Sequence, residues 1–467
     1  MEPTQNIYPP VSPQATPEES VRPPSGESFA LPVPKKSFPK VFIWIGVAVL
    51  VLLLVFLITN LLITKKAASA ELVWWGLWED ENIVAPLIIE YQAKNPKVKI
   101  RYVKQSPRDY RERLTSAFAK GAGPDIFRFH NSWVPMFRND LDTLPASVIN
   151  PADFAKTFYP IASSDLTMGT GIVGIPLEYD ALTLYINEDI FQSAGKVPPT
   201  NWDELGTLAR ELTVKDDQGT ITQSGVALGR VENVDHWQEI LALMMLQNGV
   251  DLSKPVGKQA EDALTFFTLF STVDGVWDAT LPSSTAAFAG GKLAMYFAPS
   301  WRAFEISLAN QNLKYKTIPL PQPPKDSPSE PDTSYATYWA EGVWARSAKK
   351  EAAWNFLRFL SGEESLQKLY QNASKVRAFG EPYSRVEMDN LLKDHPVVGS
   401  IINQAPGAQS WYLASRTFDG PTGINSLLSK YFEDAINAVI TGKDAKKSLD
   451  TAAQGVQQVL SQYRLTR

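Results

Sequence analysis

An uninterrupted apolar segment near the N-terminus limits what this chain can fold into. Residues 41–64 read VFIWIGVAVLVLLLVFLITNLLIT and contain no charged side chain. As an α-helix, a segment of this length extends roughly 36 Å, which is enough to cross the hydrocarbon core of a bilayer with some tilt. We therefore expect a transmembrane helix from Val41 to Thr64 that anchors the protein in the cell membrane.

The flanking lysines indicate the orientation of this anchor. Lys35, Lys36 and Lys40 precede the apolar segment, and Lys65 and Lys66 follow it. The flank with more Lys and Arg usually remains in the cytoplasm. The bias is small, and it predicts a cytoplasmic N-terminus, a single membrane pass and an extracellular C-terminal part.

A cleaved signal peptide is the alternative interpretation of the apolar segment. Ala68-Ser69-Ala70 has the small-x-small pattern of a cleavage site. However, the apolar run exceeds the usual core of about 7–15 residues, and a long tail precedes it. This tail, residues 1–40, contains ten of the 34 prolines and few large apolar side chains, so we expect it to be disordered. We favour an uncleaved anchor.

The composition excludes several classes of function. The chain has no cysteine, which excludes disulfides, thiolate metal sites and a cysteine nucleophile. Its three histidines are scattered, and its formal net charge is −5. Nucleic-acid binding needs clustered Lys and Arg, and we find no basic stripe. We therefore expect no nucleic-acid partner, no metal and no other cofactor.

Beyond the apolar segment, strand and helix patterns alternate. Residues 71–75, 98–102 and 125–129 have strand-like patterns, whereas 83–91 and the region around Leu114 have apolar residues at helical spacing. This order within about 60 residues is typical of a parallel α/β sheet.

Ligands of such sheets bind beyond the carboxyl ends of the strands. Trp78 and Glu79 follow the first predicted strand, and Asn131 and Trp133 follow the third. We therefore expect these aromatic and polar side chains at one edge of the sheet.

Five segments together resemble the extracellular solute-binding proteins of ABC importers, in the group that includes maltose- and glycerol-3-phosphate-binding proteins. The segments are LVWWGLWEDENIVAPLIIEYQAKNPKVKIRYV (72–103), GPDIFRFHNSWV (123–134), GIPLEYDALTLYINEDIF (174–191), AAFAGGKLAMYFAPSW (286–301) and YWAEGVWARSAKKEAAWNFLRFL (338–360). They occur in the family's order.

The resemblance implies a two-lobed α/β fold of the periplasmic-binding-protein type (type II), whose lobes close on a ligand between them. We expect this domain at 71–467, with lobe one at about 71–180 and 318–370, and lobe two at about 181–317 and 371–460. The implied function is non-catalytic capture of a carbohydrate, most simply an oligosaccharide, for the permease subunits of an ABC transporter. A transmembrane helix without a lipidated cysteine departs from many members of the family.

The resemblance also implies the ligand-binding residues. Pyranose rings stack on aromatic faces, and their hydroxyls bond to carboxylates, amides and Arg. The predicted ligand-binding residues are Trp78, Glu79, Asn131, Trp133, Trp301, Trp339, Glu341, Trp411 and Arg416.

Three other functions remain open from the sequence. Glu79 and Glu341 are candidates for the carboxylate pair of a membrane-anchored glycoside hydrolase. Arg128, Arg302 and Arg416 are candidates for binding an anionic glycerol phosphodiester. The membrane tether would also suit a sensory partner of a membrane kinase.

Overall fold

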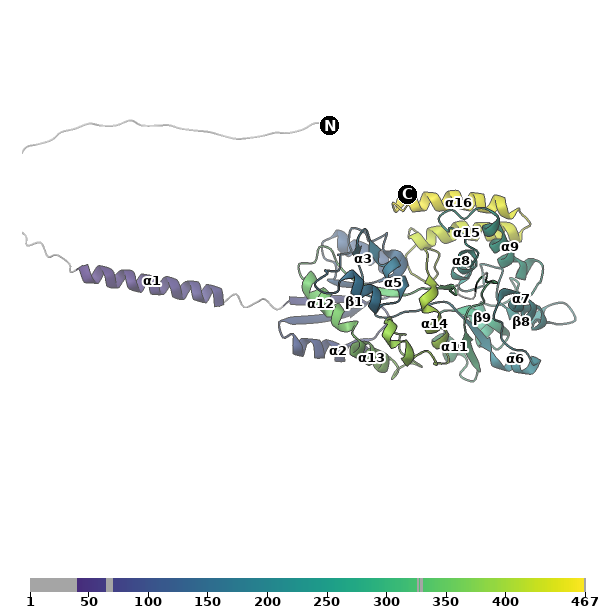
Figure 1. The fold of residues 1–467 in the computed structure, drawn as a ribbon, viewed down its shortest axis with the longest axis horizontal. Coiled ribbons are helices and arrows are strands. Elements are labelled where there is room, and N and C mark those ends of the chain that lie inside the picture. The colour runs from purple at the N-terminus through teal and green to yellow at the C-terminus, as the bar shows by residue number, and fades with distance from the viewer. Residues whose placement is uncertain (1–39, 64–69, 326, 328–330, 466–467) are drawn as a thin grey trace, which may run out of the picture. The chain divides into compact units, whose positions relative to one another are not determined.

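The computed structural model describes residues 40–63, 70–325, 327 and 331–465 (Figure 1). The chain forms two compact units, Met1–Ala67 and Ala68–Arg467. In the first, α1 (Lys40–Ile63) is a continuous helix. The predicted disordered tail, 1–40, lies outside the described residues apart from its last residue.

The predicted transmembrane helix is not confirmed. In α1, side chains are described for residues 44–55 only. Within the described part of the chain, no helix is both long and apolar enough to cross a membrane.

The first sheet of the second unit has the strand order β12-β3-β1-β2. Its strands are β1 (Ala70–Gly76), β2 (Val98–Lys104), β3 (Ile126–His130) and β12 (Trp339–Val343). The strands β1, β2 and β3 are parallel, and β12 joins β3 antiparallel with Glu341 opposite Arg128. Helix α2 (Glu81–Lys94) packs on β2 and on α13 (Glu363–Ala373), and α12 (Lys350–Leu360) packs on β1 and β12.

The second sheet has the strand order β10-β6-β9-β8-β7. Its strands are β6 (Thr183–Asn187), β7 (Val214–Lys215), β8 (Ile221–Val226), β9 (Leu293–Ala298) and β10 (Tyr315–Ile318). Every residue of β6 and β9 is buried. Figure 1 shows the elements of the two sheets on opposite sides of the unit, which confirms the predicted two-lobed α/β fold. The residue limits proposed for the lobes stay a prediction.

Two extended segments run side by side between the sheets. Residues 173–182 lead from the short hairpin at 167–172 into β6, and residues 333–338 lead back to β12. Isolated bridges join Ile175 to Glu341 and Ala181 to Ala336. This pairing places the connections at the junction of the lobes.

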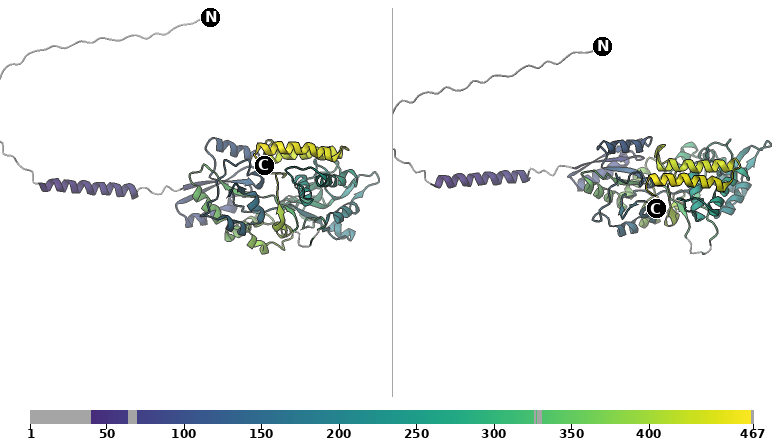
Figure 2. Two further views of the ribbon diagram at one scale, coloured as in Figure 1. Left: turned by 45° about the horizontal axis from the view of Figure 1, so that its top comes forward. Right: turned by 90° about the horizontal axis from the view of Figure 1, so that it is seen from above.

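The remaining helices surround these sheets. They are α3 (Tyr110–Ala119), α4 (Pro151–Thr157), α5 (Pro160–Asp165), α6 (Glu188–Ala194), α7 (Trp202–Glu211), α8 (Trp237–Gln247), α9 (Lys258–Thr272), α10 (Ser284–Ala289), α11 (Arg302–Ala309), α14 (Gly399–Gln404), α15 (Ile424–Ile440) and α16 (Ala445–Gln462). The pair α15 and α16, yellow in Figures 1 and 2, packs on α9. Short strands are β4 (Thr167–Met168), β5 (Gly171–Ile172), β11 (Ser334–Tyr335) and β13 (Ala408–Gln409), and 3₁₀ turns cover Asn131–Trp133, Val386–Leu391 and Ala405–Gly407.

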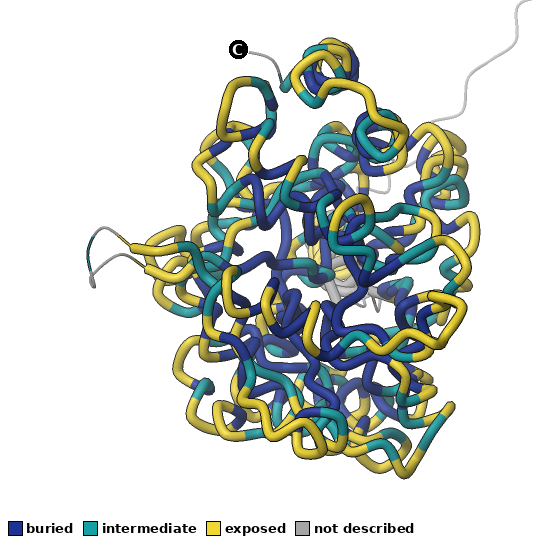
Figure 3. The backbone as a smooth tube through the Cα atoms, turned by 90° about the vertical axis from the view of Figure 1, so that its right-hand side faces the viewer, coloured by how far each residue is buried: buried dark blue, intermediate teal, exposed yellow. Residues whose placement is uncertain are grey.

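The hydrophobic core is continuous through both lobes of the second unit. Figure 3 shows buried backbone through its interior and exposed residues around the outside. Among the largest fully buried side chains are Trp74, Trp133, Trp277 and Trp354. Because these indoles are enclosed in the core, a smaller set of tryptophans remains for a binding site.

Candidate functional site

A cavity of about 310 Å³ lies among side chains from both lobes. This central cavity is lined by Trp78, His130, Glu178, Asp180, His236, Glu239, Pro299, Trp301, Phe304, Glu305, Thr337, Tyr338, Trp339, Arg377, Glu381, Ser415, Arg416 and Phe418. Its volume is at the lower end of the range of about 300–1,000 Å³ typical of small-molecule sites. Carboxyls and aromatic rings dominate the lining.

Three half-buried indoles line the cavity from three strand ends. Trp78 follows β1, Trp339 begins β12, and Trp301 follows β9. Trp78 and Trp339 contact each other edge to face, with ring centroids 5.6 Å apart. Because the strand ends fix these indoles, the cavity has aromatic surface on both lobes.

The segment 413–419 lines the cavity with Ser415, Arg416 and Phe418. The ring centroids of Phe418 and of Trp78, in lobe one, are 5.9 Å apart. Arg416 is ion-paired with Glu305 of α11, with 3.6 Å between its guanidinium nitrogen and the carboxylate oxygen. Arg416 and Phe418 have φ angles of 51° and 56°, and His236 across the cavity has 64°. Non-glycine residues rarely adopt these angles, and such strain concentrates at functional sites.

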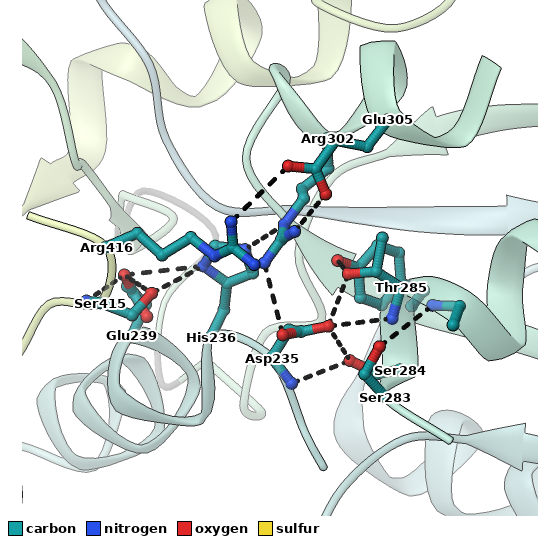
Figure 4. A network of polar contacts seen from close by, with 12 residues as sticks. Asp235, His236, Glu239, Ser283, Ser284, Thr285, Arg302, Glu305, Ser415 and Arg416 are labelled. Atoms are coloured by element: carbon teal, nitrogen blue, oxygen red, sulfur yellow. Dashed lines mark hydrogen bonds and ion pairs between the residues drawn. The ribbon is translucent and has the colours of Figure 1, made fainter. Parts of the chain in front are cut away.

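Figure 4 shows a polar network in lobe two, and two of its members, His236 and Arg302, contact the ring of Trp301. Arg302 donates from Nε to Nε2 of His236 at 2.8 Å, so the proton of the neutral ring lies on Nδ1. That side of the ring faces Ser415 Oγ at 3.0 Å, and Ser415 donates to Glu239 Oε1 at 2.8 Å. Burial lowers the pKa of His236, which keeps the ring neutral.

Glu239 is the acceptor at the end of this chain of hydrogen bonds. Burial by itself raises its pKa, but the His236 ring, whose Nδ1 lies 3.7 Å from Oε1, and the hydrogen bonds from Ser415 outweigh burial and hold the pKa below its usual value. Its Oε1 also accepts the backbone N–H of Ser415 at 2.7 Å. Glu239 therefore presents an ionised carboxylate at the cavity.

A second network lies behind the lobe-one wall. Arg128 donates to Glu79 and to Glu341, each at 2.7 Å, and Trp74 donates to Glu341 at 3.0 Å. Burial alone raises the pKa of Glu79, but Arg128 outweighs it, so that pKa is lowered. For Glu341, burial outweighs Arg128 and the pKa is raised. This network is structural because its members bond to one another.

Glu79, Glu178 and Glu381 have carboxylate oxygens within 4.8 Å of one another, a spacing compatible with a cation. Two guanidiniums already supply positive charge there, because Arg128 contacts Glu79 and Arg377 is ion-paired with Glu381 at 2.6 Å. Burial, and then the neighbouring Glu381, raise the pKa of Glu178 well above its usual value. A proton and two arginines thus account for this group without a metal.

Asp180 joins the connecting segment 173–182 to lobe two. Its side chain accepts the backbone N–H of Ser300 at 3.0 Å and the Ser300 hydroxyl at 2.9 Å. It also accepts the backbone N–H of Ala181 at 2.8 Å. Burial raises the pKa of Asp180 to about 7, although these hydrogen bonds oppose the shift.

The structure separates the nine predicted ligand-binding residues into three groups. Trp78, Trp301, Trp339 and Arg416 line the central cavity. Glu79, Trp133 and Glu341 lie behind it and are buried. Asn131 and Trp411 line a different cavity. The nine predicted residues therefore do not form a single binding surface.

Trp133 supports the cavity wall from behind. Its side chain is fully buried, and its ring contacts Trp339 edge to face at 5.3 Å and stacks near Tyr110 at 6.2 Å. Its direct ligand contact stays a prediction, but the structure gives it a packing role.

A second cavity of about 400 Å³ contains the other two predicted residues, Asn131 and Trp411. Asn131 donates to Asp165 at 2.8 Å, and Tyr338 donates to the same carboxyl at 3.0 Å. Tyr338 also lines the central cavity. Its ring therefore contributes to the wall between the two cavities.

Sequence reasoning missed His236, Glu239, Arg377 and Glu381 as lining residues, and it named neither Glu178 nor Asp180 as a ligand contact. The first four lie on helix starts or irregular segments, where no periodicity marks the inward direction. The signal available in the sequence was the residue type, because Glu and Arg are rarely buried unless they are paired.

Comparison with known proteins supplies the family. Residues 87–379 match the model of the bacterial extracellular solute-binding protein family. In sequence, the chain is 21% identical over 397 residues to the maltotriose-binding protein of Pyrococcus abyssi, covering 78% of this chain and 81% of that protein.

Solved structures show the same fold. The sugar-binding protein MalE from Xanthomonas citri superimposes with a TM-score of 0.67 at 16% identity, covering 85% of this chain and 98% of that one. The cyclic α-maltosyl-1,6-maltose binding protein from Arthrobacter globiformis superimposes with a TM-score of 0.66 at 18% identity, covering 84% and 99%. Because the family model matches more than half of the chain, this protein belongs to the bacterial extracellular solute-binding proteins.

Proposed function

We propose that this protein captures a carbohydrate in the central cavity and delivers it to the permease subunits of an ABC importer. The observation that carries this proposal is the lining of the cavity. Three indoles from separate strand ends surround it together with carboxyls. Pyranose C–H faces stack on such rings, and sugar hydroxyls donate to such carboxylates.

The relatives support a carbohydrate ligand. The Pyrococcus abyssi relative is a maltotriose-binding protein, and both compared structures are of sugar-binding proteins. We propose an oligosaccharide because Ser415, Arg416 and Phe418 also line an adjoining open groove of about 700 Å³. A chain of rings would extend from the cavity into this groove.

The lobes would close by hinge motion about the connecting segments. We keep the proposed limits, with lobe one at about 71–180 and 318–370 and lobe two at about 181–317 and 371–460. The bridge between Ala181 and Ala336 and the backbone hydrogen bond from Leu182 N–H to the carbonyl of Tyr335 support a hinge at this place.

The alternative of a glycoside hydrolase has little support in the geometry. Glu79 and Glu341 do not line the central cavity, and one guanidinium, that of Arg128, joins them. A hydrolytic pair must flank the scissile bond with one carboxyl available as an acid. We therefore propose binding without catalysis.

The alternative of an anionic phosphodiester requires guanidiniums that are available. Each candidate arginine already contacts a carboxylate: Arg128 contacts Glu79 and Glu341, Arg302 contacts Asp235 and Glu305, and Arg416 contacts Glu305. A phosphate would have to displace these pairs, so a neutral or cationic ligand fits better.

We also propose that the segment from Val41 to Thr64 tethers the protein to the membrane, with the N-terminus in the cytoplasm and the binding domain outside. The sequence of this segment contains no charged residue, and the described side chains of α1, residues 44–55, are exposed. Alkaline carbonate washing of cell membranes tests the tether. The full chain should stay in the pellet, and a chain lacking 41–64 should be released.

Tryptophan fluorescence of the full chain in detergent tests the proposed function. It would be titrated with neutral oligosaccharides and their amino derivatives, and we expect a saturable shift with at least one of them. Trp301→Ala should weaken that binding by roughly 10- to 100-fold, because it removes one stacking face. No response to any carbohydrate would contradict the proposal.

Trp202→Phe is the matched control for this titration. Trp202 stacks on Phe297 with ring centroids 5.7 Å apart, and it does not line the central cavity. This substitution should leave the affinity unchanged. An equal loss of affinity in both variants would indicate a general effect on folding.

A further inference from the structure

The unpaired charge of the central cavity indicates which kind of carbohydrate would bind there. This inference rests on the proposed carbohydrate-binding function. We infer that the protein selects a sugar bearing an ammonium group, an amino sugar, and that Glu239 binds this group through Oε2. The inference rests on an unused acceptor, on an excess of carboxyls and on indoles of which one, Trp301, already contacts two guanidiniums.

Glu239 provides the unused acceptor. Its residue is only 1% exposed, and it lines the central cavity. Its Oε1 accepts two hydrogen bonds from Ser415, whereas Oε2 has no hydrogen-bond partner among the described residues. A buried carboxylate oxygen without a donor is costly. A donor supplied by the ligand would remove this cost.

The cavity has more carboxyls than cations. Its acidic lining residues are Glu178, Asp180, Glu239, Glu305 and Glu381, and its arginines are Arg377 and Arg416. Both arginines are already ion-paired, Arg377 with Glu381 and Arg416 with Glu305. Raised pKa values keep Glu178 and Asp180 protonated at about pH 6, so the ionised Glu239 is left without an ion-paired Lys or Arg among the described residues.

The cations behind the walls do not remove this excess. Arg128 is shared between Glu79 and Glu341, and Arg302 between Asp235 and Glu305. Each of these arginines therefore faces two carboxylates. A cationic ligand group is the missing partner, whereas a hydroxyl group would satisfy Oε2 but leave the charge uncompensated.

The indoles are suited to a cation as well as to a sugar face. The guanidinium of Arg302 lies 4.5 Å from the ring centroid of Trp301, and that of Arg416 lies 5.7 Å from it. Trp78 and Trp339 are half-buried and have no such cation in the described structure. Aromatic rings beside carboxylates are the chemistry that recognises ammonium groups.

Protonation of the cavity supports the same ligand class. Burial raises the pKa of Asp180 to about 7, with Ser300 and Ala181 as its donors and Glu381 as a nearby charge. Burial and Glu381 raise the pKa of Glu178, which Arg128 and Glu79 also influence. A bound ammonium group would favour the ionised forms of both carboxyls. Binding an amino sugar should therefore release protons.

Titration calorimetry of the full chain in detergent tests the inference with matched disaccharides. The β-1,4-linked disaccharides of glucose, N-acetylglucosamine and glucosamine differ only in the substituent at C2. At about pH 6 the amines are protonated. We expect the glucosamine disaccharide to bind at least about tenfold more tightly than the other two. In buffers of different ionisation enthalpy, only this ligand should release protons.

Glu239→Gln tests the role assigned to Oε2. It should weaken binding of the glucosamine disaccharide by about tenfold more than it weakens binding of a neutral sugar, because only the ammonium group loses its counter-charge. Glu211→Gln, on the exposed face of α7, is the matched control and should change neither. Thermal melts would verify that both variants fold. The proton release of the wild-type chain tests the inference independently of the variants.

The outcomes separate this inference from the proposed function. If a neutral or acetylated disaccharide binds as tightly as the glucosamine form, the inference fails and the carbohydrate function stands. The same holds if none of the three binds but another oligosaccharide does, or if Glu239→Gln weakens every ligand equally. If no carbohydrate binds at all, both fail.

Discussion

At the scale of single residues, the site depends on buried charges held by specific partners. Arg128 is buried and links Glu79 to Glu341 behind the cavity wall. In lobe two, His236 connects Arg302 to Ser415 and thereby to Glu239. Such pairs fix the position of neighbouring aromatic rings, and removing one partner leaves an unpaired buried charge.

Arg128→Met should destabilise the protein strongly. The substitution leaves Glu79 and Glu341 buried without their cation, which costs about 3–5 kcal/mol in comparable pairs. Arg101→Met, which breaks an exposed pair with Glu71, should cost less than about 1 kcal/mol. Urea unfolding of both variants measures the difference. Equal stabilities would show that the Arg128 network carries little energy.

Asp180 should make stability depend on pH. Its pKa is about 7 in the folded protein, well above the ordinary value of 3.8. Between these values the unfolded chain is ionised while the folded chain keeps its proton, so folding stability falls as pH rises through this window. Asp180→Asn should flatten the decline in Tm from about pH 4 to 7. An unchanged slope would contradict the assignment.

The same residues show what sequence reasoning could resolve. Trp78, Trp301 and Trp339 were predictable because strand ends mark the edge of an α/β sheet. The burial of Glu341 behind the cavity was not predictable, because it depends on the antiparallel pairing of its strand with the strand of Arg128. These two residues are 213 positions apart, and neither strand's sequence shows which strand it pairs with. Glu239 was missed because its inward direction depends on contacts with the 413–419 segment.

At the scale of elements, the start of α15 organises the 413–419 segment. Asn425 is buried and donates from Nδ2 to the carbonyl of Tyr412 at 2.7 Å. Its Oδ1 accepts from Ser132 in lobe one and from Thr417, each at 3.0 Å. One amide therefore ties the segment to both α15 and the end of β3. The sequence does not reveal this link.

Asn425→Ala should loosen the segment that carries Arg416 and Phe418. The loss of three hydrogen bonds, two of them buried, should lower the free energy of unfolding by about 2–4 kcal/mol. Ligand affinity should also fall, because Phe418 would no longer be held beside Trp78. Gln454→Ala, at an exposed position of α16, is the control. Urea unfolding and ligand titration of both variants measure these effects. Equal unfolding free energies and equal affinities in the two variants would contradict the role assigned to Asn425.

At the scale of the whole molecule, two sheets joined by paired extended segments place one cavity between two lobes. The alternation of strands and helices predicted the α/β class, and the five segments predicted the family. The sequence could not show that the predicted residues lie in two different cavities, because the single segment 408–419 contributes side chains to both cavities.

Ligand binding should bring the lobes together. The chain contains no cysteine, so spin labels can be attached to cysteines introduced at single positions. Lys99 on β2 and Thr222 on β8 are exposed and belong to different sheets. Electron–electron resonance should give a shorter and narrower distance distribution with saturating oligosaccharide. A distribution that does not change with ligand would argue against hinge closure.

The position of a bound sugar tests the account most directly. A crystal structure of the full chain with its tightest oligosaccharide would locate the rings. The account predicts a ring in the central cavity, stacked on Trp301, Trp78 or Trp339 and bonded to Glu239. A sugar bound instead in the second cavity against Trp411, or outside both cavities, would contradict it.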